Sequence, residues 1–329
     1  MRGAAGRRIL LVGPQVFGYE RAIGEQLSSG GAVVTYLNDR PWDAVWLKGL
    51  LRLFPRLLWH WADRHYRDWI AAEAPAAIDI VLVLKGEALS PRTLRRLRAH
   101  YPAARFVYYL WDSIANTRGA TSRFETFDAL YSQDPEDCRK HSALRYRPLF
   151  FLPVYQDARN QRSLSKACYF LGTLNGDRPQ VLARISNALK PGYSLDYWLY
   201  VRSGLELQLR WLVDHALRRL DPRRLLRRPM NSREIARHYA QAAAVIDIEH
   251  YRQTGLTMRT FEALAAGCKL ITTNPHIARE AFYDPQRILI IDRTRPVIPA
   301  QFLASDAAPL GEEFLQKYSL AAWLEELLG

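Results

Sequence analysis

The chain has 329 residues, enough for two ordinary domains, and 49% of them are hydrophobic, which excludes extended disorder. Lysine and arginine outnumber the acidic residues 46 to 33, a formal net charge of +13 that favours an anionic partner. The three cysteines lie far apart without metal-ligand spacing, which indicates a reducing compartment. Because no apolar run is long enough to span a bilayer, we expect a cytoplasmic protein, dissolved or held peripherally at the inner face of the cytoplasmic membrane.

The first half of the chain alternates short apolar runs with helical patterns. A helix is predicted over residues 19–28, and Ser90 followed by Pro91 predicts the start of another, since serine caps helices and proline suits their first turn. Strands are predicted at residues 9–12, 33–37, 80–84, 106–110 and 129–131. This alternation predicts a parallel sheet with helices on both faces.

The same pattern begins again after a polar stretch at residues 156–166. Strands are predicted at residues 169–171, 245–248, 270–272 and 288–291, and helices at 178–189, 205–220, 256–266 and 312–328. The predicted fold class is therefore α/β, with an N-terminal Rossmann-like domain at residues 1–155 and a C-terminal one at residues 156–329. The final helix is expected to pack back toward the N-terminal domain.

One strand–loop–helix segment of the second half carries the most specific pattern. A predicted strand ends in Asp247, a loop containing Gly255 leads into a helix, and Gly267 ends that helix. The first turn of such a helix presents unpaired N–H groups and the positive end of its dipole, which suits a diphosphate. Arg259 could add a charge-assisted bond to phosphate, and Glu262 could accept two ribose hydroxyls. An exposed ion pair between these two side chains is the alternative.

Residues 255–274 resemble the donor-binding motif of GT-B glycosyltransferases, in which a glutamate-bearing helix ends in a phrase like Glu-Ala-Leu-Ala-Ala-Gly. Phrases at residues 85–87, 108–113 and 127–135 are similar to a bacterial branch that makes lipopolysaccharide, capsule or exopolysaccharide. The resemblance implies two Rossmann-like domains facing each other across a cleft, with the acceptor on the N-terminal domain and a nucleotide-sugar donor on the C-terminal domain. Many retaining members carry two glutamates eight positions apart. Here Glu262 matches the second and Thr254 stands at the first, so retaining and inverting mechanisms both stay open.

The resemblance also implies a donor site in the second half. Gly172 and Thr173 match the first-strand loop that approaches the donor phosphates, and Glu249 follows a strand and precedes the donor helix. No cofactor is expected besides the donor itself, a UDP-sugar in preference to a GDP-sugar. The predicted donor-binding residues are Gly172, Thr173, Glu249, Thr254, Gly255, Leu256, Thr257, Arg259 and Glu262.

Polar residues that follow the strands of the first half are candidates for the acceptor site, because α/β sheets bind ligands at the carboxyl ends of their strands. Inverting transfer needs a general base, and Asp112 is the first candidate because it follows a strand and an aromatic residue that could pack on a sugar ring. Glu20 is the second. A helix cap and a solvated helix position are their respective alternatives. The predicted acceptor-binding residues are Gly18, Tyr19, Lys85, Trp111 and Ser113.

The sequence contains no Asp-x-Asp pair and no His/Cys cluster with zinc spacing. We therefore expect a metal-independent reaction in which a helix dipole and cations stabilise the leaving nucleotide.

Two basic segments suggest an anionic membrane surface as a further partner. Residues 42–69 combine a Leu/Trp face with basic residues every four positions, typical of an interfacial helix, and Pro55 should kink or divide it. Residues 218–233 form an arginine cluster. The alternative for residues 42–69 is a core-facing amphipathic helix with a solvated basic face.

Two other functions compete with sugar transfer. A catalytically inactive GT-B scaffold would fit Thr254 at the expected glutamate position. A nucleic-acid-binding protein would fit the isoelectric point of about 9.8, but the sequence has no helix-turn-helix, RNP or zinc-finger pattern, so no nucleic acid is expected.

Overall fold

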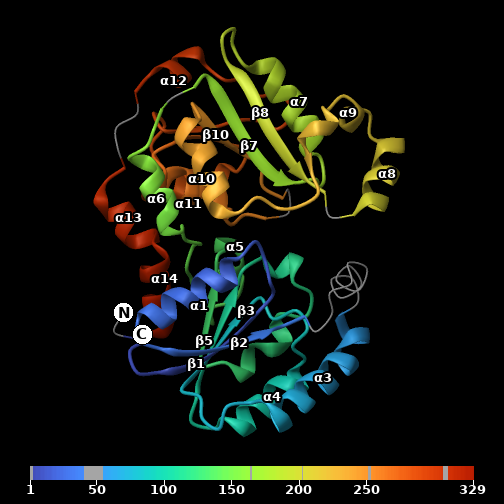
Figure 1. The fold of residues 1–329 in the computed structure, drawn as a ribbon, viewed down its shortest axis with the longest axis vertical. Coiled ribbons are helices and arrows are strands. Elements are labelled where there is room, and N and C mark those ends of the chain that lie inside the picture. Colours follow the sequence, from blue (N-terminus) through green and yellow to red (C-terminus); the bar gives the residue numbers. More distant parts are fainter. Residues whose placement is uncertain (1–2, 41–54, 164, 202, 251–252, 307–309) are drawn as a thin grey trace. The chain divides into compact units, whose positions relative to one another are not determined.

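The computed structural model describes residues 3–40, 55–163, 165–201, 203–250, 253–306 and 310–329. The chain divides into two compact units (Figure 1). Unit 1 comprises Met1–Leu149, Arg252–Gly255 and Leu320–Gly329, and unit 2 comprises Phe150–Tyr251 and Leu256–Ser319. The last ten residues therefore belong to the first unit.

Unit 1 is built on a six-stranded parallel sheet with the strand order β2-β1-β3-β4-β5-β6. Every residue of β3 is buried, as expected of a central parallel strand that is covered on both faces. The strands are β1 (Arg8–Gly13), β2 (Val33–Asn38), β3 (Ile80–Leu84), β4 (Arg105–Leu110), β5 (Ala129–Ser132) and β6 (Leu144–Tyr146).

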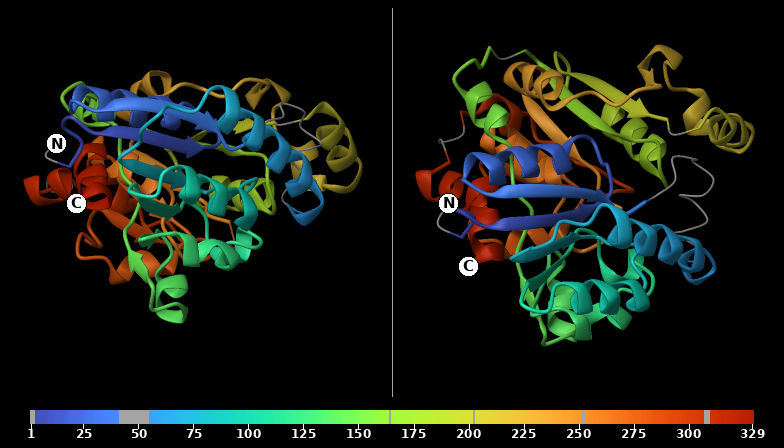
Figure 2. Two further views of the ribbon diagram at one scale, coloured as in Figure 1. Left: turned by 90° about the horizontal axis from the view of Figure 1, so that it is seen from below. Right: turned by 60° about the horizontal axis from the view of Figure 1, so that its bottom comes forward.

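Helices cover both faces of this sheet (Figures 1 and 2). Alternate residues of β4 show the two layers. Phe106 and Tyr108 join the core beneath α3 and α4, whereas the ring of Tyr109 packs against Trp323 of α14, with ring centroids 4.7 Å apart. Ser90 caps α4 by accepting a hydrogen bond from the Thr93 amide, as predicted. The helices are α1 (Tyr19–Ser29), α3 (Pro55–Ala72), α4 (Pro91–His100), α5 (Pro135–Lys140) and α14 (Leu320–Leu328).

Unit 2 contains a second six-stranded parallel sheet, with the order β12-β11-β10-β7-β8-β9. Gly267 has a φ of 72° and ends α11, which confirms the predicted glycine cap. The strands are β7 (Ala167–Thr173), β8 (Ser194–Tyr200), β9 (Leu225–Leu226), β10 (Ala244–Asp247), β11 (Lys269–Thr272) and β12 (Ile288–Ile290). The helices are α6 (Pro153–Arg159), α7 (Arg178–Ala188), α8 (Gly204–Val213), α9 (His215–Arg218), α10 (Ser232–Gln241), α11 (Met258–Ala265), α12 (Ala300–Ala304) and α13 (Glu312–Tyr318).

Two predicted helices are each divided in the structure. The helix predicted at 205–220 breaks at Asp214, whose carboxylate accepts hydrogen bonds from the Ala216 and Leu217 amides and so starts α9. The helix predicted at 312–328 breaks at Ser319, and the carbonyl of Tyr318 accepts a hydrogen bond from the amide of Phe151 instead.

Strands β6, β8 and β9 were not predicted from the sequence. Asp196 interrupts the apolar residues of β8, so this strand lacks the continuous apolar run that predicts a buried strand. All but one of its last six residues are only partly buried.

Residues 42–54 of the first basic segment lie outside the described residues, and the rest of that segment falls in α3. Tyr66 and Trp69 of α3 are buried in the core of unit 1, while Trp61 is 59% exposed. None of the helices in the described ranges combines the length and the apolarity needed to cross a bilayer.

Candidate functional site

Asp247, the last residue of β10, is 1% exposed and fixes the start of α11. Its Oδ2 accepts hydrogen bonds from the hydroxyls of Thr257 and Thr260, both at 2.9 Å, and its Oδ1 lies 2.6 Å from Nη1 of Arg259. The Arg259 guanidinium also lies 5.0 Å from the centre of the Phe170 ring. The arginine predicted to contact phosphate is thus already paired with a buried carboxylate.

Glu249, two residues beyond β10, belongs to a second ion-pair group. Its Oε1 lies 2.5 Å from Nη1 of Arg293, and its Oε2 accepts a hydrogen bond from the Thr273 hydroxyl. Arg293 also lies 2.9 Å from Asp177. Burial raises the pKa of Glu249, and the hydrogen bond from Thr273 and the charge of Arg293 partly oppose that shift.

Arg178, the first residue of α7, was not predicted from the sequence. Unlike Arg259 and Arg293, it is not paired with a carboxylate among the described residues. Its Nε and Nη2 donate to the carbonyl of Ile248 at 3.1 and 2.9 Å, and its Nη1 donates to the carbonyl of Thr173 at 2.9 Å. Within the part of the chain that the structure describes, it forms no ion pair. Burial and the nearby charge of Arg259 lower the pKa of Arg178 to about 10. The nearby carboxylates of Asp247 and Glu249 oppose that shift, but the guanidinium is paired with neither of them and stays protonated at neutral pH.

The loop after β7 is shaped around Arg178. At Gly172 an added Cβ would lie 2.7 Å from Cζ of Phe170 and 3.3 Å from Nη1 of Arg178, so a larger residue would displace one of them. The predicted residues Gly172 and Thr173 thus lie beside a cation. A basic residue opening the helix after this loop was the sequence feature that could have revealed Arg178.

Further along α11, Glu262 is 3% exposed and lies one turn beyond Arg259. Its charge contributes to the raised pKa of Tyr239, after the larger effect of burial. Thr257 is the N-cap residue of this helix but makes no side-chain cap, because its hydroxyl donates to Asp247. Leu256, before the cap, is a buried apolar residue.

Thr254 and Gly255 group with unit 1. The Thr254 hydroxyl donates to Asp134, and the amides of Thr254 and Gly255 lie 3.2 and 3.3 Å from Oδ2 of the same carboxylate. A Cβ at Gly255 would lie 2.6 Å from the backbone oxygen of Gln133, so this position requires glycine. The Thr254 side chain is therefore engaged by Asp134, which also caps α5.

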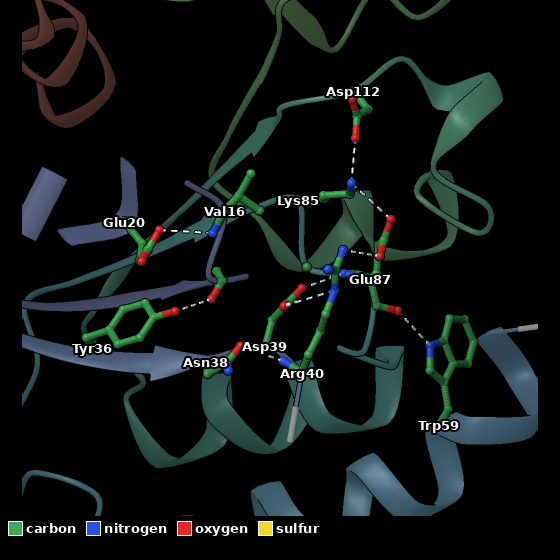
Figure 3. A network of polar contacts seen from close by, with 12 residues as sticks. Val16, Glu20, Tyr36, Asn38, Asp39, Arg40, Trp59, Lys85, Glu87 and Asp112 are labelled. Atoms are coloured by element: carbon green, nitrogen blue, oxygen red, sulfur yellow. Dashed lines mark hydrogen bonds and ion pairs between the residues drawn. The ribbon is translucent and has the colours of Figure 1, made fainter. Parts of the chain in front are cut away.

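In unit 1, Lys85 links two carboxylates at the carboxyl ends of β3 and β4 (Figure 3). Its Nζ lies 2.5 Å from Oδ2 of Asp112 and 3.2 Å from Oε1 of Glu87. Lys85 has a φ of 65°, and its carbonyl accepts a hydrogen bond from the Tyr108 hydroxyl at 2.8 Å. The structure thus joins the predicted base, Asp112, which is 31% exposed, to the predicted acceptor residue Lys85.

The same network continues to Asp39 and Arg40, which were not predicted from the sequence. Nη2 of Arg40 lies 2.6 Å from Oε2 of Glu87, and the Glu87 amide donates to Oδ2 of Asp39 at 2.9 Å (Figure 3). Asp39 has no exposed surface, and burial raises its pKa to about 6. Three carboxylates and two cations form a chain in which opposite charges are neighbours.

The other predicted residues of unit 1 lie near α1 and the end of β4. Gly18 begins α1 with a φ of 81°, and Oε2 of Glu20 accepts a hydrogen bond from the Val16 amide at 3.0 Å. The rings of Tyr19 and Trp111 lie 5.8 Å apart. Ser113 is 2% exposed and precedes a short 3-10 helix at Ile114–Asn116. Tyr19 and Trp111 are thus brought together, whereas Ser113 is nearly inaccessible.

Among the described residues, no group of three or more His, Cys, Asp or Glu side chains is placed to hold a metal ion. No known protein-family model matches the chain, and no curated protein sequence does.

Solved structures do match it over nearly its whole length. A glycosyltransferase from Rickettsia africae has a TM-score of 0.56 and 14% identity, covering 97% of this chain and 96% of that one. HepE from Anabaena, in complex with UDP and glucose, has a TM-score of 0.58 and 11% identity, covering 97% and 98%. The N-terminal domain of a Candida albicans trehalose-6-phosphate phosphatase has a TM-score of 0.54 and 11% identity, covering 97% and 86%.

The chain has the GT-B fold. The predicted fold class is confirmed by this likeness and by the two parallel sheets with their flanking helices. At such low identities the likeness establishes the GT-B fold and not an activity.

Proposed function

We propose that this protein transfers a sugar from a UDP-sugar to a saccharide or lipid-linked acceptor, in the synthesis of a cell-surface polysaccharide. The observation that carries this proposal is Arg178. Within the described residues this partly buried guanidinium, at the carboxyl end of a parallel sheet, donates only to carbonyls, so its charge can attract an anionic ligand. The diphosphate of a nucleotide sugar supplies that anion. HepE, which shares the fold, was solved with UDP and glucose.

The donor is held by two helices of unit 2, α7 and α11. Arg178 and the first turn of α11, whose amides no side chain caps, bind the diphosphate, since both present positive charge. Glu262, near the middle of the same helix, accepts the ribose hydroxyls. Arg259 acts mainly by holding the helix start against Asp247, and the N–H groups that Asp247 leaves unused add to the phosphate contact.

The acceptor is activated in unit 1. Asp112 takes the proton from the acceptor hydroxyl as the general base of an inverting transfer, and Lys85 holds that carboxylate in place. Glu20 is the alternative base. Trp111 and Tyr19 supply aromatic surface for a sugar ring. As the bond to the donor sugar breaks, Arg178 and the α11 dipole stabilise the charge on the leaving UDP, so the reaction needs no metal ion.

A lipid-linked acceptor would place the enzyme at the inner face of the cytoplasmic membrane. The exposed ring of Trp61 and the solvent-exposed Arg227 and Arg228 support attachment through the two basic segments, residues 42–69 and 218–233. Arg223 and Arg224 of the second segment already pair with Asp221 and Asp196.

The proposal is tested by incubating the protein with a panel of radiolabelled UDP-sugars and candidate saccharide or lipid-linked acceptors, with EDTA present. Transfer that persists in EDTA supports it. Saturable UDP binding without transfer or donor hydrolysis would favour the inactive scaffold, for which the engaged hydroxyl of Thr254 is the supporting observation. Absence of binding to UDP and every UDP-sugar would refute both.

A further inference from the structure

A basic cavity of about 510 Å³ lies in unit 2 at the opposite end of the sheet from the proposed donor site. Five of its lining residues either open a strand or immediately precede one, so they mark the amino edge of the sheet, whereas the proposed donor residues follow the carboxyl ends. The strand-end residues that line it are Lys166 before β7, Tyr193 before β8, Ala243 before β10, Lys269 in β11 and Arg287 before β12.

Five cationic side chains and one carboxylate, that of Asp306, line this cavity among the described residues. Burial lowers the pKa of Lys269, and the nearby positive charges of Arg287 and Arg162 lower it further, although the charge of Asp306 opposes them. Like charges gathered this closely repel one another unless an anion lies between them.

Helix ends account for part of the positive charge. Arg162 donates to the carbonyls of Tyr239, Ala242 and Ala266 at the carboxyl ends of α10 and α11, and its Nη1 lies 2.9 Å from Sγ of Cys268. Lys269 donates to carbonyls at the end of α12. These cations offset the negative ends of three helices.

The side chains of Arg159, in the last turn of α6, and Lys166 donate to no helix-end carbonyl among the described residues. Within the described ranges the side chains of both residues form neither a hydrogen bond nor an ion pair, and Lys166 is exposed. They line the same cavity as three other cations, Arg162, Lys269 and Arg287. Arg159 and Lys166, together with these three cations, form a site for an anion with more than one negative charge.

We propose that this cavity binds a phosphate group, either a free phosphate or phosphomonoester or the headgroup of an anionic lipid. Guanidinium and ammonium groups match phosphate oxygens with charge-assisted hydrogen bonds. The volume also leaves room for a small organic group attached to the phosphate. The site is separate from the donor site and does not depend on the chain being a transferase.

The test is isothermal titration of the full-length protein with inorganic phosphate at fixed ionic strength, together with sedimentation of phosphatidylglycerol vesicles. The variant is Arg159→Ala/Lys166→Ala, and the charge-matched control is Arg237→Ala/Arg295→Ala, which alters two exposed arginines of the same unit outside the cavity. We expect the first variant to lose at least tenfold in phosphate affinity and the control to change less than twofold. Lys166→Ala alone, at an exposed position, serves if the double variant does not fold.

The vesicle arm distinguishes the two sources of phosphate. Weaker vesicle binding by the cavity variant than by the control supports a lipid headgroup, and unchanged vesicle binding with weakened phosphate binding supports a soluble ligand. No saturable phosphate binding by the wild type, or equal affinities of the two double variants, would overturn the proposal.

Discussion

The carboxyl ends of the two sheets carry similar numbers of charged side chains but arrange them differently. In unit 1, Asp39, Glu87 and Asp112 alternate with Arg40 and Lys85, and each cation lies within 4.0 Å of two carboxylates (Figure 3). In unit 2, Arg259 and Arg293 are paired with carboxylates, but Arg178 has only carbonyl partners within the described residues.

This difference suggests what each end is built to receive. A network that neutralises its own cations has little attraction for an anion, and one surplus carboxylate leaves it able to accept a proton. The carboxyl end of the sheet in unit 2, where the Arg178 guanidinium is not paired with a carboxylate among the described residues, attracts a diphosphate. The contrast matches a neutral acceptor in unit 1 and a nucleotide-sugar donor in unit 2.

The largest expected effect is on catalysis through unit 1. Asp112→Asn removes the proposed base but keeps the size of the side chain, so we expect the transfer rate to fall by about 10²–10⁴-fold while UDP affinity is unchanged. Transfer assays and titration with UDP measure the two quantities. Asp68→Asn, at an exposed carboxylate of the same unit, is the control. If Asp112→Asn keeps the wild-type transfer rate, Asp112 is not the base and Glu20 becomes the candidate.

The next effect concerns donor binding through unit 2. Glu262→Ala removes a carboxylate proposed to accept two ribose hydroxyls, and charged hydrogen bonds of this kind correspond to roughly ten- to a hundredfold in affinity. UDP affinity should fall by that factor. Uracil and ribose-free phosphates, which lack the contact, should bind as before. Glu313→Ala, exposed on α13, should change nothing. Unchanged UDP affinity in Glu262→Ala would contradict the assignment.

The smallest effect concerns the loss of stability caused by ionising buried Asp39 in the charged network of unit 1. Burial raises the pKa of Asp39 from 3.8 to about 6, so folding opposes its ionisation. Its contribution to stability is complete below about pH 4 and is lost as the pH rises to about 6. Asp39→Asn removes this dependence. Relative to wild type, its free energy of unfolding should rise by roughly 2–3 kcal/mol between pH 4 and pH 7.

Urea unfolding at several pH values, followed by tryptophan fluorescence, measures that difference. If the free energies of unfolding of wild type and Asp39→Asn change equally from pH 4 to pH 7, ionisation of the Asp39 carboxyl does not destabilise the folded protein.

The strands whose ends form both sites were predictable, because a parallel sheet needs continuous apolar runs and its strand ends gather at one edge. The partners were not. The strand predicted at 33–37 stops one residue before the end of β2, so Asp39 and Arg40 were not recognised as strand-end residues. Thr254 and Asp134 lie 120 positions apart, and no local pattern records their hydrogen bond.

The arginines of unit 2 show the same limit. Arg259 was singled out by its place in a motif, but only the fold reveals that Asp247 already holds it. Arg178 follows a loop that was recognised, and its lack of a carboxylate partner is a three-dimensional property that neighbours in the sequence do not determine.

The most direct test of the donor assignment is isothermal titration of UDP into the wild type, Arg178→Met and the exposed control Arg295→Met. The account predicts saturable binding to the wild type and the control, and affinity at least tenfold weaker in Arg178→Met, with a greater loss for UDP than for uridine. Equal UDP affinities in the three proteins, or no UDP binding by the wild type, would contradict it.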